Sequence, residues 1–435
     1  MSGQATIRLI ASLAVLVFGN VLSAGPLNPP GGPVTSTTKS LGEVEPRVAV
    51  SQSNTPGNAT SLYRITQPGS YYLTGNITGI SGKHGIEIVA SGVNLDLNGF
   101  ELAGVASPNI CDGVRTGVNG LSNIAVVNGT IRNWGNGIRL DNFPVQGCRI
   151  EDIRASNTVF NVGAGISAII SRVSTLGGEY GIYAQDGSTV SDCSARNASE
   201  IGIATLSSGN VTRCSAHSCQ FGITVGNAST VAHCSANSNV LQGIYTGFGC
   251  TISNCSAYSN DLEGILTGPA CIIQSCTAAL NGTHGIQTSD GCITTNCSAA
   301  VNEESGIVVA TGCSVIECNT RANEFNGIQC IDKCVIRGNT ASDEGLFLGG
   351  AGISVNGSAN RIEGNNSAGS FCGIEVTATG NIIIKNTCRG NSINWDVIAG
   401  NVILVVPAAY SGAGVFGNSG GNAPGSVDPN ANFSY

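Results

Sequence analysis

The stretch GIYTGFGCTISNCSAYSNDLE at residues 243–263 is followed by two near copies of itself, GILTGPACIIQSCTAALNGTH at 264–284 and GIQTSDGCITTNCSAAVNEES at 285–305. A strict repeat of 21 residues predicts a solenoid, because each unit must stack on its neighbours to bury its apolar face. The glycine that opens each repeat, followed by Ile or Val, recurs at Gly85, Gly113, Gly137, Gly181, Gly202, Gly222, Gly243, Gly264, Gly285, Gly306, Gly327, Gly352 and Gly373.

Each repeat contains three short segments in which polarity alternates, at 244–246, 250–252 and 255–257 in the first copy above. A period of two over about three residues predicts a β-strand. Parallel strands usually need helical crossovers, but connections this short leave no room for a helix. The sequence therefore predicts an all-β, right-handed parallel β-helix with about 21 residues and three short strands per coil. Spacings of 24 and 28 between the early glycines indicate insertions, and one degenerate coil should start at Asn161-Val162.

The termini predict four regions. Residues 1–24 resemble a secretory signal peptide, because Arg8 precedes an apolar run from Leu9 to Phe18 and small residues follow at Ser23 and Ala24. Residues 25–60 are rich in Pro, Gly, Ser and Thr, which indicates a flexible linker. Residues 61–400 are assigned to the β-helix, with 61–80 as its N-terminal cap, and 401–435 to a C-terminal strand and a loose tail.

Composition limits the partners. The net charge is −8, which argues against nucleic acid, because phosphate binding needs basic patches. The apolar run near the N-terminus is short for a membrane span and is interrupted by Gly19 and Asn20, so export with cleavage is the preferred interpretation over a membrane anchor. We expect a secreted or cell-surface protein, with the periplasm as the alternative location and no membrane span after cleavage.

Equivalent positions in successive coils form columns of one residue type. Stacked Asn side chains at a bend can bond amide to amide, and Asn tolerates the left-handed conformation of tight turns. One apolar column runs from Ile182 through Ile203 and Ile223 to Ile328, and an asparagine column contains Asn239, Asn260, Asn281, Asn302 and Asn323.

The 18 cysteines suggest disulfides in an exported chain, but their columns argue for buried thiols. Upstream, Ile153 and Val173 occupy the position that seven cysteines take later, so this position demands a small inward apolar group. Stacked Cβ atoms stay ~4.8 Å apart, too far for a good disulfide. A Cys-x4-Cys metal site is disfavoured, because zinc pairs usually lie two to four residues apart. The better disulfide candidates, with partners left open, are Cys111, Cys148, Cys219, Cys330, Cys372 and Cys388.

Variable residues precede each Gly-Ile pair, and loops on one edge of a solenoid commonly carry function. This edge is acidic, which favours either a solvated edge or a site for sugar or Ca²⁺, although no calcium motif supports the latter. We expect no metal or other cofactor. The candidate binding residues on this edge and on the neighbouring outward strand positions are Asp261, Glu263, Glu303, Glu304, Glu324, Tyr183 and Tyr245.

A second candidate site lies in the early coils. Arg115 and Arg139 each follow a Gly-hydrophobic pair, so both should face outward on one sheet. Asp112 and Asp141 are close in sequence, as are Arg132 and Arg154, which makes these carboxylates and Arg115 and Arg139 candidate catalytic groups. A lyase needs a cation to neutralise a uronate carboxylate and a base to take the proton. The alternative is an ordinary charge ladder across coils. His84 and His284 precede Gly-Ile pairs and should be loop residues.

The segments Ile65 to Ile77 (ITQPGSYYLTGNI), Gly85 to Ile88 (GIEI) and Val93 to Phe100 (VNLDLNGF) resemble the opening of bacterial secreted right-handed β-helix repeat proteins of the pectate-lyase-like superfamily. The ending ANFSY at 431–435 is similar to theirs. The resemblance covers nearly the whole chain and implies the fold, whereas that superfamily mixes lyases, hydrolases, epimerases and non-enzymatic surface proteins. The polygalacturonase motifs are absent apart from His284-Gly285, which argues against a hydrolase.

The sequence thus favours an exported, non-catalytic surface or matrix scaffold that contacts polysaccharide. The alternative is a polysaccharide lyase or a related enzyme acting on uronate-containing glycans through the early coils.

Overall fold

The computed structural model describes residues 46–105, 111–143, 145–346, 349–407, 414–417 and 428–434. The chain divides into two units at Pro46, and all the described strands lie in the second unit, Arg47–Tyr435. The signal peptide predicted at 1–24 lies outside the described residues, as does most of the predicted linker. The second unit is an all-β solenoid of about 17 turns with about 21 residues per turn, and none of its described residues is helical.

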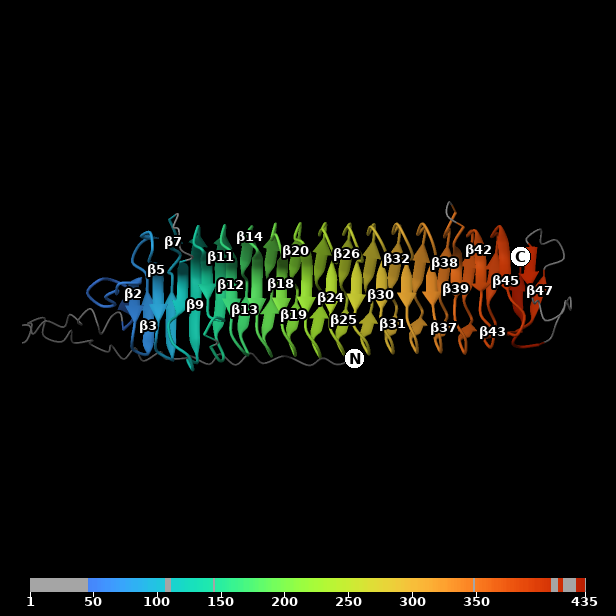
Figure 1. The fold of residues 1–435 in the computed structure, drawn as a ribbon, viewed down its shortest axis with the longest axis horizontal. Coiled ribbons are helices and arrows are strands. Elements are labelled where there is room, and N and C mark those ends of the chain that lie inside the picture. The colour runs from blue at the N-terminus through green and yellow to red at the C-terminus, as the bar shows by residue number, and fades with distance from the viewer. Residues whose placement is uncertain are drawn as a thin grey trace, which may run out of the picture. The chain divides into compact units, whose positions relative to one another are not determined.

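The strands form three parallel sheets, which Figure 1 shows as rows of arrows, with the first sheet in the middle of the view, the second below and the third above. The first sheet contains β2 (Ser61–Ile65), β5 (His84–Ile88), β8 (Asp112–Thr116), β10 (Asn136–Arg139), β12 (Phe160–Ala164), β15 (Tyr180–Ala184), β18 (Ile201–Thr205), β21 (Phe221–Val225), β24 (Ile244–Thr246), β27 (Ile265–Thr267), β30 (Ile286–Thr288), β33 (Ile307–Val309), β36 (Ile328–Cys330), β39 (Ala351–Val355), β42 (Cys372–Val376), β45 (Ile393–Val397) and β48 (Gly414–Gly417).

The second sheet follows the first within each coil. It contains β1 (Val48–Ala49), β3 (Gly69–Tyr72), β6 (Val93–Asp96), the beginnings of β9 (Ile124–Arg132) and β11 (Arg149–Ser156), β13 (Ile169–Ser171), β16 (Thr189–Ser191), β19 (Asn210–Thr212), β22 (Thr230–Ala232), β25 (Thr251–Ser253), β28 (Ile272–Gln274), β31 (Ile293–Thr295), β34 (Ser314–Ile316), β37 (Val335–Arg337), β40 (Arg361–Glu363), β43 (Ile382–Ile384) and β46 (Val402–Ile403).

The third sheet completes each coil, and the ends of β9 and β11 also belong to it. Its other strands are β4 (Ile77–Thr78), β7 (Glu101–Ala103), β14 (Ser174–Leu176), β17 (Ser194–Arg196), β20 (Ser215–His217), β23 (Ser235–Asn237), β26 (Ser256–Tyr258), β29 (Thr277–Ala279), β32 (Ser298–Ala300), β35 (Asn319–Arg321), β38 (Thr340–Ser342), β41 (Asn366–Ala368), β44 (Thr387–Arg389), β47 (Val405–Pro407) and β49 (Asn432–Ser434).

The register of the first sheet confirms the predicted columns. Ile182 pairs with Ile203, and Ile203 with Ile223, and all three are fully buried. The degenerate coil is also where the sequence places it, because Val162 is the partner of both Ile138 and Ile182. At about 1.5–3 kcal/mol per buried aliphatic side chain, these columns stabilise the long, narrow core.

Each coil bends three times, and at most bends a residue with positive φ precedes a buried residue whose side chain points inward. We call the three resulting columns bend ladders. The first ladder includes Ser188, Ser229, Cys250, Cys271, Cys292, Cys313, Cys334, Asn360, Asn381 and Asn401. The second ladder includes Cys193, Cys214, Cys234, Cys255, Cys276, Cys297, Cys318, Asn339, Asn365, Asn386 and Asn432. The third ladder includes Cys219, Asn239, Asn260, Asn281, Asn302, Asn323, Glu344, Ser370 and Asn391.

The ladder side chains accept hydrogen bonds from the backbone of the coil before. The N–H of Asn281 donates to Oδ1 of Asn302 at 3.1 Å, and the N–H of Cys250 donates to Sγ of Cys271 at 3.3 Å. A buried backbone N–H needs an acceptor, and in these ladders Ser, Cys, Asn or Glu side chains provide it. The cysteines are therefore acceptors as well as the small apolar groups that the sequence predicts. The asparagine column bonds amide to amide as expected, but the left-handed conformation falls on the residue before, such as Leu280.

The solenoid begins before residue 61 and ends after residue 400, the two boundaries that the sequence predicts for it. β1 pairs with β3, so a strand precedes the predicted start at residue 61, and β2, β3 and β4 form a regular coil rather than a separate cap. At the other end, β49 inserts beside β44 and β47, and the buried side chain of Asn432 accepts from Nδ2 of Asn386 at 3.0 Å. This part of the predicted loose tail is therefore docked, whereas 418–427 lie outside the described residues.

The cysteines give a first testable prediction. All 18 are buried, and those other than Cys111 are free thiols, including the five other predicted disulfide candidates. Burial raises the pKa of Cys148 to about 11 and that of Cys372 to about 12, which suppresses the reactive thiolate. We expect few thiols to react with DTNB in the native protein and most to react in 6 M guanidinium chloride. A low thiol count after unfolding would contradict the structure.

Candidate functional site

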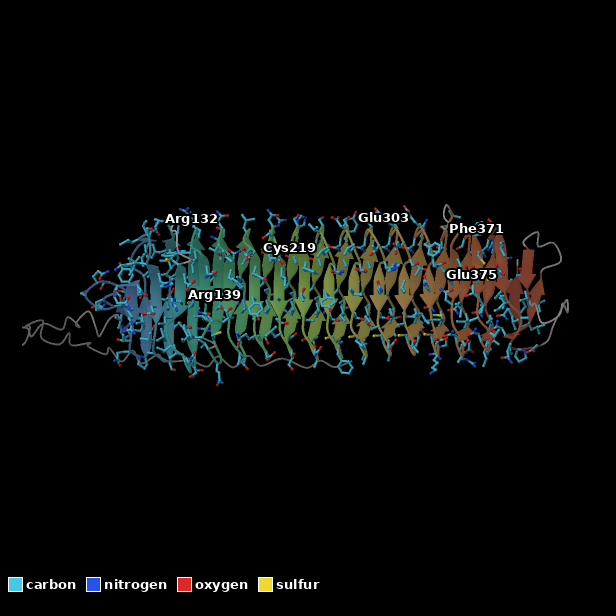
Figure 2. The ribbon with its side chains drawn as sticks, viewed as in Figure 1. Arg132, Arg139, Cys219, Glu303, Phe371 and Glu375 are labelled. Atoms are coloured by element: carbon cyan, nitrogen blue, oxygen red, sulfur yellow. The ribbon has the colours of Figure 1, made fainter. Side chains whose placement is uncertain are left out.

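Two arginines of the early coils lie side by side on the outward face of the first sheet. Arg115 of β8 and Arg139 of β10 are direct partners in the parallel register, as their position after a Gly-hydrophobic pair predicts. Their side chains are only 19% and 18% exposed. Figure 2 shows Arg139 on the sheet that faces the viewer. The register therefore places two half-buried guanidinium groups on neighbouring coils.

Arg139 is held by a carboxylate and an aromatic ring. Its Nε donates to Oδ1 of Asp141 at 2.9 Å, and its guanidinium lies 4.2 Å from the centre of the Phe160 ring. Asp141 follows β10 in a turn, and its carboxylate covers Gly163, where a Cβ would lie 2.3 Å from Oδ1. The absence of a side chain at Gly163 thus makes room for Asp141 on this face.

Arg115 has an equivalent environment. Its Nη1 contacts Nε2 of His84 at 2.8 Å and Oδ2 of Asp112 at 3.5 Å, and the Phe143 ring lies 5.9 Å away. His84 is the first residue of β5, so the expectation that it is a loop residue is wrong. Asp112 also accepts from Nδ2 of Asn136 at 2.6 Å. A network of buried and partly buried hydrogen bonds therefore holds Arg115 in place.

These groups surround a cavity of about 240 Å³ on the face of the sheet. It is lined by His84, Asp112, Arg115, Asn136, Arg139 and Asn142. Three of the four candidate catalytic residues line it, and the fourth, Asp141, is bonded to Arg139 at its rim. The structure thus brings Asp112 and Asp141, which the sequence could place only near one another in the chain, to Arg115 and Arg139, which the sequence places on one sheet.

Burial controls the protonation of the site. It raises the pKa of Asp141 above the usual range, because the side chain is only 8% exposed, and the adjacent Arg139 only partly offsets this. Burial also raises the pKa of Tyr183, and the negative charge of Asp141 adds to that rise. A carboxyl that is easier to protonate than usual, beside a fixed cation, has the properties of a proton-transfer group.

Aromatic side chains continue the site along the sheet. Phe160 and Tyr180 are partners on β12 and β15, and their rings stack with centres 4.4 Å apart and planes at 14°. Tyr183 meets Phe160 edge-on at 6.2 Å. We call Arg115, Arg139, Phe160, Tyr180 and Tyr183 the arginine–aromatic face. Phe160 and Tyr180 were missed from the sequence, although their place before the glycine column puts them on this face.

Tyr245 does not join this face. The column from Tyr183 continues through Ala204 and Thr224 before it reaches Tyr245, so the two tyrosines lie three coils apart as predicted. Tyr245 is 42% exposed. Tyr245 is therefore separate from the arginine–aromatic face, although it lies on the same sheet.

The acidic edge has the predicted register. The backbone N–H groups of Asp261, Gly282, Glu303 and Glu324 bond the carbonyls of successive ladder asparagines. Gly282 leaves a gap between Asp261 and Glu303, which border a cavity of about 380 Å³ at the edge that Figure 2 marks by Glu303. These carboxylates are exposed, so water screens them.

The other two acidic candidates are already bonded. Glu263 accepts from Nε2 of Gln242 at 2.9 Å, and Glu304 lies 3.2 Å from Nε2 of His284. Across the described residues, no group of three His, Cys, Asp or Glu side chains is arranged to hold a metal ion. The same residues contain no helix that could cross a membrane.

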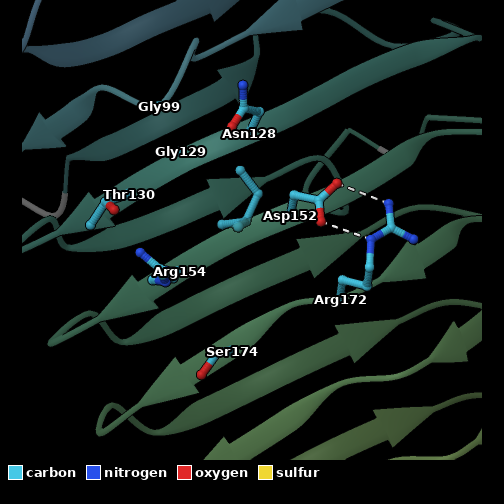
Figure 3. Close-up of a pocket in the computed structure, with 9 residues that line it drawn as sticks. Gly99, Asn128, Gly129, Thr130, Asp152, Arg154, Arg172 and Ser174 are labelled. Atoms are coloured by element: carbon cyan, nitrogen blue, oxygen red, sulfur yellow. Dashed lines mark hydrogen bonds and ion pairs between the residues drawn. The ribbon is translucent and has the colours of Figure 1, made fainter.

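Arg132 and Arg154 are close to the site in sequence but not in space. Both lie on the third sheet, where Arg132 pairs with Glu101 and Arg154 lines a different cavity of about 340 Å³. Figure 3 shows Arg154 on one side of that cavity and Arg172 on the other, where Arg172 donates to both carboxylate oxygens of Asp152 at 2.7 and 2.9 Å. The long strands β9 and β11 pass from the second sheet to the third and carry these arginines away from Arg115.

No model of a known protein family matches the chain, and no curated protein matches it significantly. Among solved structures, the A-module of mannuronan C-5 epimerase AlgE6 of Azotobacter vinelandii is 16% identical, with 85% of this chain and 91% of that chain covered and a TM-score of 0.40. The periplasmic alginate epimerase AlgG is 11% identical over 72% and 80% of the two chains, with a TM-score of 0.38.

A third structure of this kind is the tailspike protein of E. coli bacteriophage HK620, as its D339N mutant in complex with a pentasaccharide. It is 14% identical over 74% of this chain and 69% of that chain, with a TM-score of 0.41. These likenesses are distant. The strand pairing of the chain itself makes it a parallel β-helix protein.

Proposed function

We propose that the chain is an exported, non-catalytic scaffold that binds a carboxylate-bearing polysaccharide on the arginine–aromatic face, on or outside the cell. The observation that carries the proposal is the pair of fixed guanidinium groups on neighbouring coils, next to a stacked aromatic pair. The acidic edge suits a uronate polymer poorly, because its carboxylates would repel the ligand. We therefore propose that the polysaccharide binds to the first sheet and not to the acidic edge.

The chemistry of the face matches such a ligand. Guanidinium groups bind carboxylates through paired N–H donors, and half-buried ones do so with less screening than exposed ones. Aromatic rings offer apolar surface to a sugar ring. Neighbouring coils are ~4.8 Å apart, so a polymer lying along the solenoid axis meets Arg115, Arg139 and then Phe160 in turn.

Substitution of Arg139 tests the proposal. We expect Arg139→Ala to weaken the binding of polygalacturonate about 10- to 100-fold, because a hydrogen bond to a charged group contributes about 1.5–3 kcal/mol. Isothermal titration calorimetry measures the dissociation constants. Arg213→Ala is the matched control, since Arg213 pairs with Asp192 on an exposed bend. Equal affinity of the two variants, or tight binding of neutral dextran, would contradict the proposal.

A lyase or related uronate-active enzyme is the second candidate, and the environment of Asp141 favours it. A raised carboxyl pKa beside Arg139 offers a proton-transfer group next to a cation that can neutralise a uronate carboxylate. Incubation of the protein with polygalacturonate or alginate, followed at 235 nm, separates the two functions. Unsaturated product that disappears in Arg139→Ala would establish the enzyme and overturn the non-catalytic scaffold.

A further inference from the structure

Both ring nitrogens of His84 face N–H donors. The backbone N–H of Asp112 points at Nδ1 with its nitrogen 2.9 Å away, and Nη1 of Arg115 lies 2.8 Å from Nε2. A guanidinium has only donors, so its contact with Nε2 requires that this nitrogen carry no proton. A neutral ring has only one unprotonated nitrogen, so when Nε2 accepts from Arg115 the proton resides on Nδ1, 3.4 Å from Oδ2 of Asp112, and Nδ1 cannot then accept from the backbone N–H of Asp112. The Arg115 contact therefore exists only with a neutral His84.

Protonation of His84 and the Arg115 contact exclude each other, because an imidazolium has N–H groups on both nitrogens. The charged groups around the ring are Asp112 and Arg115 on β8 and Glu87 on its own strand β5. Burial holds the pKa of His84 below its usual value, Asp112 and Glu87 oppose this, and Arg115 adds to it. In the protein without ligand, His84 is thus neutral, and its Nε2 accepts a hydrogen bond from Nη1 of Arg115.

We infer that a polysaccharide carboxylate binding to Arg115 displaces the guanidinium from Nε2 and that His84 then takes up one proton from the solvent. This inference rests on the proposed function and adds that pH regulates the binding of the polysaccharide. The bound carboxylate replaces His84 as the acceptor of Arg115, and its negative charge stabilises the imidazolium. One N–H bond forms at the ring, and the bond that held this proton breaks in a hydronium ion or a buffer acid of the solvent. By linkage, a ligand whose binding takes up a proton binds more tightly at lower pH.

Calorimetry with polygalacturonate measures the proton directly. At pH 7, titrations in two buffers of different ionisation enthalpy should show an uptake that approaches one proton per site. Between pH 6 and pH 8 the affinity should fall by up to tenfold per pH unit. His84→Gln keeps an acceptor for Arg115 but cannot titrate, so it should bind with no uptake in this pH range. The control His217→Gln, on the third sheet, should leave the uptake unchanged, and Asp141→Asn should retain it.

A second measurement uses the protein without a ligand. In ¹⁵N-histidine NMR spectra, assigned with His84→Gln, the pKa of His84 should rise in Arg115→Gln, because the cation that opposes protonation is removed. An unchanged His84 titration would overturn the inference. Binding of polygalacturonate with no proton uptake would overturn it too and leave the proposed function standing. No binding at pH 6 or pH 8 would overturn both.

Discussion

Asn281→Leu should lower the free energy of unfolding by about 4 kcal/mol. Oδ1 of Asn281 accepts from the N–H and from Nδ2 of Asn260 at 3.1 and 2.9 Å, and all of these atoms are buried. Leucine fills a similar volume but offers no acceptor, so two buried donors lose their partner at about 1–3 kcal/mol each. It also removes the bond from Nδ2 of Asn281 to Oδ1 of Asn302. Urea unfolding followed by circular dichroism measures the change.

Two comparisons isolate the ladder. Asn319→Ala changes an exposed asparagine on β35 and should cost less than ~0.5 kcal/mol. Asn281→Cys should cost less than Asn281→Leu, because Cys219 occupies the same ladder and thiols accept N–H donors in the other two. A loss below about 1 kcal/mol for Asn281→Leu would show that the amide ladder does not hold the coils together.

Glu344→Gln should stabilise the protein by about 3 kcal/mol above pH 7 and much less at pH 4.5. Glu344 ends the run of ladder asparagines with a fully buried carboxyl. Burial raises its pKa from 4.5 to about 7, although the N–H and Nδ2 of Asn323 donate to Oε2 at 2.7 and 3.0 Å. The other oxygen, Oε1, lies beside the hydroxyl of Thr320, and neither has a well-formed hydrogen bond.

The raised pKa of Glu344 determines in which direction the stability of the protein changes with pH. The folded state binds the proton more tightly than the unfolded state, so the stability is full below pH 4.5, falls as the pH rises from there, and is lost once the pH passes about 7. A shift of this size corresponds to about 3 kcal/mol. Gln cannot ionise, and its amide can bond both Asn323 and Thr320. Urea unfolding from pH 4.5 to 8.5 should therefore depend less on pH in Glu344→Gln.

Glu324→Gln provides the matched control, because Glu324 is exposed on the edge of the neighbouring coil. It should leave the pH dependence of the wild type in place. If Glu344→Gln and the wild type lost the same stability between pH 4.5 and pH 8.5, Glu344 would not be the buried titrating group that the structure describes.

The fold could be predicted because the period is visible in single residue types. Gly before Ile sets the register, and the register alone places Arg115 beside Arg139. The acceptor role of the cysteines is harder to predict, because upstream the same position holds Ile153 and Val173, whose side chains accept no hydrogen bond. The signal lay downstream, where Asn339 follows Cys318 by 21 residues and accepts the same kind of N–H bond. A column in which Asn replaces Cys indicates that the side chain at this position accepts a hydrogen bond.

The site could be predicted only in part. Strand positions are periodic, so the arginines could be placed, but Asp141 lies in a turn and reaches the sheet only because Gly163 lacks a side chain. The sequence predicts a loop at His84 because later coils have their variable residues at this position, whereas the first-sheet strands of the early coils start earlier and include it. The proximity of Arg132 and Arg154 in sequence was misleading, because one coil carries the chain through three sheets.

Hydroxyl-radical footprinting with and without polygalacturonate tests the central claim most directly, because it reports which side chains the polymer covers. Our account predicts protection of Phe160, Tyr180 and Tyr183, with Tyr245 on the same sheet unchanged, and loss of that protection in Arg139→Ala. Protection along the acidic edge at 261–263 and 303–325 in place of the arginine–aromatic face would contradict it.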